Sequence, residues 1–259
     1  MVFVQLRNRM RFVLVFFLLT VPLFGRNYST NFQSPENPLS DGGNWLNGGN
    51  CSGCGVYWNN IKTTAGFAQS AASTSSASGF DDATAVVTGS WGPDQTVQIV
   101  PKNPSSLGGT QEVEIRLRTT ITAGSITGYE IDFTTGGTYI VRWNGKGPFI
   151  SNYGWTQLGP AINYKWTGGA VLKASIVGTV ITVWANGNQI GTHDTASDGP
   201  PTDGSGGAAR YSTGNPGFGI DINSATAATD FGITSFTATD GSSSPSQPSP
   251  PTGLTGTVH

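Results

Sequence analysis

Histidine, cysteine and basic residues are scarce in this sequence. Its 259 residues include two histidines, two cysteines and thirteen Lys and Arg. A Ser-His-Asp hydrolase needs a histidine next to a serine on a sharp turn, and no Gly-x-Ser-x-Gly elbow is present. A zinc site would need two ligands beyond Cys51 and Cys54, and the only histidines are His193 and His259. We therefore predict no metal site built on histidine or cysteine.

A hydrophobic run long enough to cross a bilayer is also missing. The longest run, Phe12 to Phe24, is interrupted by Thr20 and Pro22 and falls short of the roughly 20 residues that a spanning helix needs. It follows a stretch with three arginines, which is typical of a secretory signal. The sequence thus predicts a signal peptide over residues 1–26 and a secreted, extracellular protein without a membrane span.

The net charge of the secreted portion limits which classes of partner are expected to bind. Removing residues 1–26 takes away four of the thirteen basic residues and leaves fifteen acidic ones, a formal charge of about −6. Nucleic acids, anionic lipids and polyuronates bind basic grooves, so this surface disfavours them. Neutral polysaccharides carry no such electrostatic penalty, and we expect a neutral polysaccharide or glycan as partner.

Strand-length runs of β-branched and aromatic residues recur along the chain, and no window shows a sustained helical period. These runs predict an all-β, two-sheet antiparallel β-sandwich over residues 27–240. The expected strands are Gly55 to Trp58, Gly66 to Ala71, Ala83 to Val87, Thr96 to Val100, Glu112 to Thr120, Tyr129 to Thr134, Tyr139 to Trp143, Val171 to Ile176, Val180 to Ala185, Phe218 to Ile222 and Phe231 to Ala238.

The segment from Val171 to Asp194 is the most informative stretch. It reads as two alternating runs joined at Gly178-Thr179, followed by an Asn186-Gly187 turn into a third run. Together with Gly214 to Ile220, it resembles the second half of a concanavalin A-like jelly roll. That superfamily includes lectins, laminin G-like modules and laminarinase-type glucanases, so the resemblance implies a carbohydrate-binding or carbohydrate-cleaving domain.

The composition changes after Asp240. Residues 241–251 form a Ser/Pro-rich linker, and residues 252–259 resemble the start of a fibronectin type III-like module. Both features predict that the sandwich is one of several neighbouring modules in a longer extracellular chain.

Cys51 and Cys54 lie close together in a Gly-rich loop as Cys-Ser-Gly-Cys. In an exported chain, such a pair favours a small loop-closing disulfide. We therefore predict a structural bond between them.

One strand carries an enzymatic pattern. Laminarinase-type glucanases have Glu-x-Asp-x-x-Glu, or a version one residue shorter, and Glu130 and Asp132 match its first two acids. Alternation places both on one face. The acid/base position, 134 or 135, is threonine, which cannot protonate a leaving oxygen. We therefore predict no catalytic residue. In the alternative, an endo-acting glycoside hydrolase, Glu130 is the nucleophile and Asp132 is its helper. The missing acid would then come from Glu112 or Glu114.

A structural interpretation of the same acids is a cross-strand charge ladder. If the strands around residues 112–120 and 129–134 pair, Arg116 and Arg118 fall near Asp132 and Glu130 on a solvated face, and Arg142 joins them from the next strand. The residues expected in the core are then Val113, Ile115, Leu117, Ile131, Phe133, Tyr139, Val141 and Trp143.

Aromatic residues in loops and at strand ends suggest ligand binding. Indole and phenol rings stack on sugars, and amides bind hydroxyl groups. We predict as ligand-binding residues Trp155, Tyr153, Asn152, Trp166 and Trp91. The alternative is that these rings cap the open ends of the sandwich.

No cofactor is predicted, but the resemblance leaves calcium open. Jelly rolls of this superfamily often bind calcium where the terminal strands meet, which here suggests Asp41 with Asp221 or Asp230. The sequence therefore predicts a secreted, noncatalytic glycan-binding or adhesive module. The alternatives are the glucanase and a structural spacer.

Overall fold

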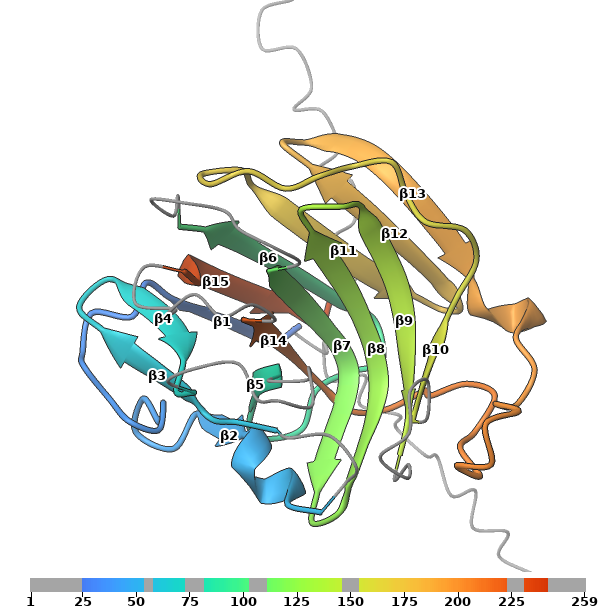
Figure 1. Cartoon of the computed structure of the whole chain (residues 1–259), viewed down its shortest axis with the longest axis horizontal. Helices are drawn as coiled ribbons and strands as arrows, with labels where there is room; N and C mark the ends of the chain where they lie inside the picture. Colours follow the sequence, from blue (N-terminus) through green and yellow to red (C-terminus); the bar gives the residue numbers. More distant parts are fainter. Residues whose placement is uncertain are drawn as a thin grey trace, which may run out of the picture.

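The computed structural model describes residues 25–53, 58–72, 82–102, 111–145, 154–222 and 231–241. Two antiparallel sheets lie face to face (Figure 1). Within the described ranges, helix is confined to two 3-10 turns, η1 (Gly48–Cys51) and η2 (Thr195–Ser197). No helix in them is long and apolar enough to cross a membrane. The predicted all-β sandwich is confirmed.

Fifteen strands of the described chain divide into two sheets. The eight-stranded sheet has the order β13 (Asn188–Asp194), β12 (Val180–Ala185), β11 (Leu172–Val177), β6 (Gln95–Pro101), β15 (Ile233–Thr239), β4 (Phe67–Ser70) and β3 (Ile61–Thr64), with β1 (Asn27–Thr30) paired to β15. The seven-stranded sheet has the order β10 (Trp155–Gln157), β9 (Thr138–Asn144), β8 (Ser125–Thr134), β7 (Glu112–Thr122), β14 (Asn215–Asp221), β5 (Asp82–Val87) and β2 (Trp45–Asn47).

The predicted meander of β11, β12 and β13 is present. β11 and β12 pair along their whole length, and β12 continues through Asn186-Gly187 into β13. Both turn residues have positive φ, 50° and 81°, as a tight hairpin with the right-handed twist of the strands requires. The strand predicted at Gly55 to Trp58 falls mostly outside the described residues.

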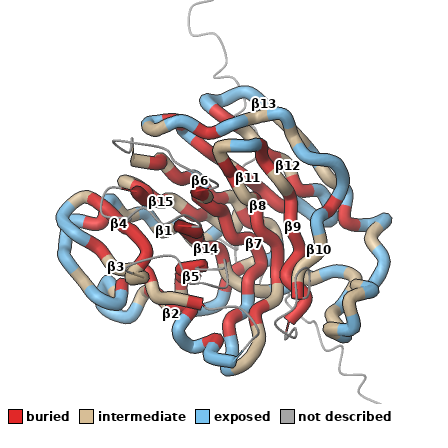
Figure 2. The backbone as a smooth tube through the Cα atoms, viewed as in Figure 1, coloured by how far each residue is buried: buried red, intermediate tan, exposed pale blue. Residues whose placement is uncertain are grey.

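The core between the sheets is lined by alternating residues, which Figure 2 shows as buried stretches along the strands. Five of the residues expected there are fully buried and belong to this core: Val113, Ile115, Leu117, Ile131 and Phe133. Trp45 joins them, with its ring 4.9 Å from that of Phe236 in β15. This packing anchors β2, at the edge of the seven-stranded sheet, to the eight-stranded sheet.

The pairing of β8 with β9 corrects part of the expected core. Phe133 pairs with Thr138, so four residues lie between them and even-numbered residues of β8 face odd-numbered residues of β9. Val141 therefore lies beside Glu130 on the outer face, together with Tyr139 and Trp143, which were expected in the core. Arg142 lies on the opposite face, so it does not join the predicted charge ladder.

A register shift in β7 corrects the position of Arg118. This residue has a φ of 47° at an irregularity in the pairing with β8, so its side chain leaves the face that carries Glu130. The guanidinium instead donates hydrogen bonds to the carbonyl oxygens of Pro93, Gly178 and Tyr211 at 2.6, 2.8 and 3.1 Å. Arg118 therefore ties three loops together.

The two ends of the domain meet beside β1 and β15. The backbone nitrogen of Asp240 donates to the carbonyl oxygen of Arg26 at 3.0 Å, and the Asp240 carboxylate accepts from the Gly92 nitrogen at 2.6 Å. The predicted signal peptide lies almost entirely outside the described residues, and so do all of the linker except Gly241 and all of the possible fibronectin-like segment.

Candidate functional site

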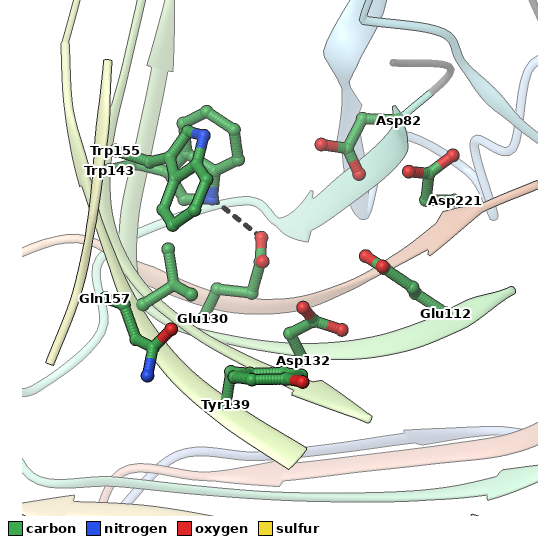
Figure 3. Close-up of a pocket in the computed structure, with 10 residues that line it drawn as sticks. Asp82, Glu112, Glu130, Asp132, Tyr139, Trp143, Trp155, Gln157 and Asp221 are labelled. Carbon is green, nitrogen blue, oxygen red and sulfur yellow. Dashed lines mark hydrogen bonds between the residues drawn. The ribbon is translucent and has the colours of Figure 1, made fainter. Parts of the chain in front are cut away.

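A cavity of about 200 Å³ lies on the outer face of the seven-stranded sheet. Figure 3 shows five carboxylates from four strands directed into one space, with two indole rings on one side. The lining residues are Asp82, Glu112, Glu130, Asp132, Tyr139, Val141, Trp143, Trp155, Gln157 and Asp221. Glu130 and Asp132 share this face, as their alternation predicts.

Strand register brings the acids together. Glu114 pairs with Asp132, and Arg116 pairs with Glu130, across β7 and β8. On the other side of β7, Glu112 pairs with Asp221 of β14, which in turn pairs with Asp82 of β5. Because paired residues point to the same side of a sheet, residues distant in the chain converge on one floor.

Arg116 lies at the centre of this floor. Its guanidinium forms ion pairs with Glu114 and Glu130, and a third with Asp82 at 3.4 Å. Glu114, Arg116 and Glu130 are 1, 0 and 4% exposed, so the ladder expected on a solvated face is a buried network instead. Because water is excluded, each charge depends on its partners far more than a surface pair would.

Aromatic rings cover the guanidinium. The Arg116 Cζ lies 5.0 Å from the ring centre of Trp58 and 5.7 Å from that of Trp143, and the two indoles meet edge to face at 4.8 Å. The Trp143 Nε1 donates to the Glu130 carboxylate at 2.6 Å. These rings belong to a small apolar cluster on the outer face, which also contains Ile121 and Ile126 and closes the cavity on that side.

Burial shifts the acids toward their protonated forms. Desolvation raises the pKa of Glu112 and Asp132 well above the usual range, and the neighbouring carboxylates raise it further. The pKa values of Glu114 and Glu130 are also raised by burial, although the Arg116 charge acts against the shift. The nearby Asp132 charge contributes to the raised pKa of Glu112.

These shifts predict an unusual pH dependence of stability. A buried acid with a raised pKa keeps its proton in the folded state, while the unfolded chain releases it near pH 4. The folded state then binds more protons, so the free energy of unfolding falls as pH rises above that value. We expect urea denaturation to give a free energy of unfolding at least about 1 kcal/mol higher near pH 5 than near pH 8.

The control for this pH dependence is removal of the titrating group. Glu114→Gln and Asp132→Asn should each flatten the dependence between the two pH values. A wild-type protein whose stability increases from pH 5 to pH 8 would contradict the assignment, because that is the behaviour of carboxylates with lowered pKa values.

Gly219 of β14 leaves room for the ion network. A Cβ at this position would overlap the Glu114 carboxylate and lie 2.9 Å from the Arg116 guanidinium. We expect Gly219→Ala to lower the free energy of unfolding by about 1–3 kcal/mol, as overpacking typically does. Gly199→Ala is the matched control, since a Cβ there meets nothing within 4 Å. Equal urea midpoints for both variants would show that the network needs no glycine.

A second hollow, of about 430 Å³, lies beside the first across edge strand β10. Trp155 and Gln157 line both hollows, and the segment from Asp198 to Asp203 forms the far wall. Asp203 is held by hydrogen bonds from the Asn144 side chain and the Gly154 nitrogen at 3.0 and 3.1 Å. Arg142 and Thr156 also line this hollow, and both lie on the face opposite to Glu130, so the hollow reaches around the edge strand to the other side of the sheet.

The residues predicted to bind a ligand lie in different parts of the structure. Trp155 is half-buried and lines both hollows. Trp166 is 1% exposed and stacks against Phe231, so its ring is not accessible to a ligand. Trp91 lies under Arg26 and donates to the Thr88 carbonyl at 3.2 Å, and it does not line the cavity. For Trp166 and Trp91, the alternative prediction that the rings cap the ends of the sandwich fits the structure. The predicted residues Asn152 and Tyr153 lie outside the described residues.

Thr134 has a structural role where glucanases of this pattern carry an acid. Its hydroxyl accepts from the nitrogens of Gly136 and Gly137 at 2.8 and 2.9 Å, and it donates to the Gly137 carbonyl. The residue thus closes the turn between β8 and β9, and a hydroxyl with these bonds provides no acid for a glycosidic oxygen.

The other predicted ligands and bonds have mixed outcomes. Asp41 and Asp221 line different hollows, so the structure does not bring these two expected calcium ligands together, and Asp230 lies outside the described residues. Within the described ranges, no group of three or more acidic, histidine or cysteine side chains has the arrangement of a metal site.

Cys51 is buried, but Cys54 is outside the described ranges, so their disulfide stays a prediction.

The sequence-based predictions missed six residues of the cavity. Asp82 precedes the expected strand by one residue, Asp221 was considered only as a calcium ligand, and Gln157 was not considered. The other three, Tyr139, Val141 and Trp143, were assigned to the core. A usable signal existed for Asp82, because an acid that alternates with the alanines of a buried strand must point away from the core. Nothing local indicates that it meets Asp221, which lies far along the chain.

Comparison with known proteins gives structural matches alone. No family model and no curated protein matches the sequence. An inactivated mutant β-agarase B in complex with agaro-octaose has a TM-score of 0.51 at 10% identity, covering 84% of this chain and 94% of that chain. The carbohydrate-binding module CBM66 from Bacillus subtilis gives 0.44 at 9% identity, covering 76% and 92%. The Emp46p carbohydrate recognition domain, metal-free form, gives 0.48 at 10%, covering 83% and 96%.

Structural similarity at such low sequence identity indicates a shared architecture and not a shared activity. This chain has two facing antiparallel sheets. Its fold is therefore an antiparallel β-sandwich of the jelly-roll type, as the sequence predicts.

Proposed function

We propose that this domain is a noncatalytic carbohydrate-binding module and that the outer face of the seven-stranded sheet is its binding groove. One observation carries the proposal: the accessible indole of Trp155 borders a cavity floored by carboxylates. Indole faces stack on the apolar faces of pyranose rings, and carboxylates accept hydrogen bonds from hydroxyl groups. The same combination is typical of saccharide sites, where a few polar groups fix orientation.

The contacts of the acids support a noncatalytic role. The Glu130 carboxylate is engaged by Arg116 and Trp143, and Thr134 closes a turn. Retaining hydrolysis needs a free nucleophile and a protonated acid roughly 5 Å apart. The proposal includes export directed by residues 1–26 and a place beside other modules in a longer extracellular chain.

A glycoside hydrolase is the second candidate, favoured by one specific observation. Glu112 lines the same cavity as Glu130, and burial raises its pKa. Glu112 thus has the properties of the acid that residues 134 and 135 lack. Release of reducing ends from a polysaccharide that disappears in Glu130→Gln would favour this enzyme over the binding module.

Affinity electrophoresis tests the proposed function. The protein is run at near-neutral pH, with and without calcium, through gels containing glucans, xylan, mannan or an amine-bearing polysaccharide. Retardation by one of these supports the groove and identifies its ligand class. Unchanged mobility in every gel would overturn the binding module and favour a structural spacer.

A further inference from the structure

The cavity has more acids than cations to balance them. Five carboxyl groups line it and Glu114 lies below them. Among the described residues, the ion pairs of this cluster all come from one guanidinium, that of Arg116, which is shared by Glu114, Glu130 and Asp82. The floor therefore stays rich in acceptors even after Arg116 is counted.

One acceptor has no donor at all within the described chain. The Oδ1 atom of Asp132 is fully buried and has no hydrogen-bond partner there. A buried oxygen without a donor costs about 1–3 kcal/mol, and such groups are rare in native proteins. Asp132 also lines the cavity, so a bound ligand is well placed to supply the donor.

The aromatic side of the cavity suits a cation as well. Trp143 and Trp155 stand across from Asp82 and Asp221 in Figure 3. Indole faces attract cations, more strongly when water is excluded, and Arg116 already lies 5.7 Å from the Trp143 ring. A ligand between the two sides would meet an indole face and carboxylates at once.

We propose that the groove selects a saccharide with a protonated primary amine, a hexosamine unit whose nitrogen is not acetylated. The ammonium donates to Asp132 and Glu112, and the pyranose ring stacks on Trp155. An ammonium offers three donors and no acceptor, so it satisfies the buried oxygen, and its positive charge favours the ionised forms of Asp132 and Glu112. A hydroxyl group provides one donor and no charge. This inference rests on the proposed function and replaces the expectation of a neutral sugar, which came from overall charge alone.

Titration calorimetry with three β-1,4-linked hexasaccharides tests the selection. The probes are deacetylated chitohexaose, its fully N-acetylated form and cellohexaose, compared at mildly acidic pH, where the amine is charged. A charge-assisted hydrogen bond contributes about 1.5–3 kcal/mol, so the deacetylated form should bind at least about tenfold more tightly than either neutral form. Equal or tighter binding of a neutral form overturns the inference and leaves the proposed function intact. Absence of binding by all three overturns the inference, and the electrophoresis panel then decides separately whether the proposed function stands.

Variants separate the specific site from general attraction to an acidic protein. Asp132→Asn and Glu112→Gln should reduce the preference for the deacetylated form to about threefold or less. Asp194→Asn is the matched control: it removes the same charge from an exposed turn, and asparagine can still accept the hydrogen bond from the Ala196 nitrogen. A preference that survives both cavity variants, or that falls equally in the control, overturns the site.

An oligolysine of matched charge tests whether the ammonium must be carried on a sugar. Oligolysine has the amine without a pyranose ring, so it should bind at least about tenfold more weakly than deacetylated chitohexaose. Equal or tighter binding of oligolysine would overturn the saccharide assignment and point to a lysine-rich protein partner.

Discussion

Replacement of Arg116 by methionine is expected to lower the free energy of unfolding by about 3–5 kcal/mol at neutral pH. The guanidinium is fully buried and forms ion pairs with Glu114, Glu130 and Asp82. Without it, these acids remain away from water with no opposing charge. Breaking a buried pair by removing one partner is among the costliest single substitutions, because the other charge stays uncompensated.

The pH dependence of that loss identifies its cause. Near pH 5 the freed carboxyls take up protons, so urea denaturation should show a smaller difference from wild type than near pH 7. Arg210→Met is the control, since Arg210 is exposed and its guanidinium donates to the Ala196 carbonyl at 2.6 Å. It should change stability by no more than about 0.5 kcal/mol. A loss of the same size at both pH values would instead indicate lost packing against Trp58 and Trp143.

Truncation of Trp155 to alanine should weaken saccharide binding by about 2 kcal/mol, or about 30-fold in Kd. The indole is half-buried and lines both hollows beside β10. A large aromatic ring at the centre of a groove loses its whole stacking surface in this change. Isothermal titration with the best saccharide from the electrophoresis panel measures the effect.

Trp184→Ala is the matched control for Trp155. Trp184 is also half-buried on a strand, but it belongs to β12 of the eight-stranded sheet, where Lys173 lies 4.2 Å from its ring centre. Its loss should leave Kd unchanged within about twofold, because it does not line the groove. If both variants weaken binding alike, the ligand lies elsewhere or the effect comes from stability.

Stability alone does not explain the buried ion network around Arg116. A cluster of apolar residues of similar volume is often as stable as a buried ion network or more so. Here Glu130 of the network and its neighbours Glu112 and Asp132 all have pKa values raised by burial. Perturbed acids that line a cavity are more typical of functional sites than of structural cores.

Local alternation determined a large part of this protein from sequence. Because successive side chains on a strand point to opposite faces, the sequence alone placed Val113, Ile115 and Leu117 in the core. It also placed Glu130 and Asp132 on one face. The Asn186-Gly187 pair likewise fixed its hairpin, since the positive φ that a tight turn needs is a property of those two residues. All of these predictions depend on residues that are neighbours in the chain.

Tertiary structure decided which faces meet. The four residues between Phe133 and Thr138 reverse the parity of β9 relative to β8, which moves Trp143 onto the cavity and Arg142 away from it. Asp82 and Asp221 reach the same cavity only because β5 and β14 pair across a long interval of sequence. Turn length and strand order are set by packing of the whole sandwich. Alternation can therefore assign a side chain to a face, but the composition of the site depends on which strands lie side by side.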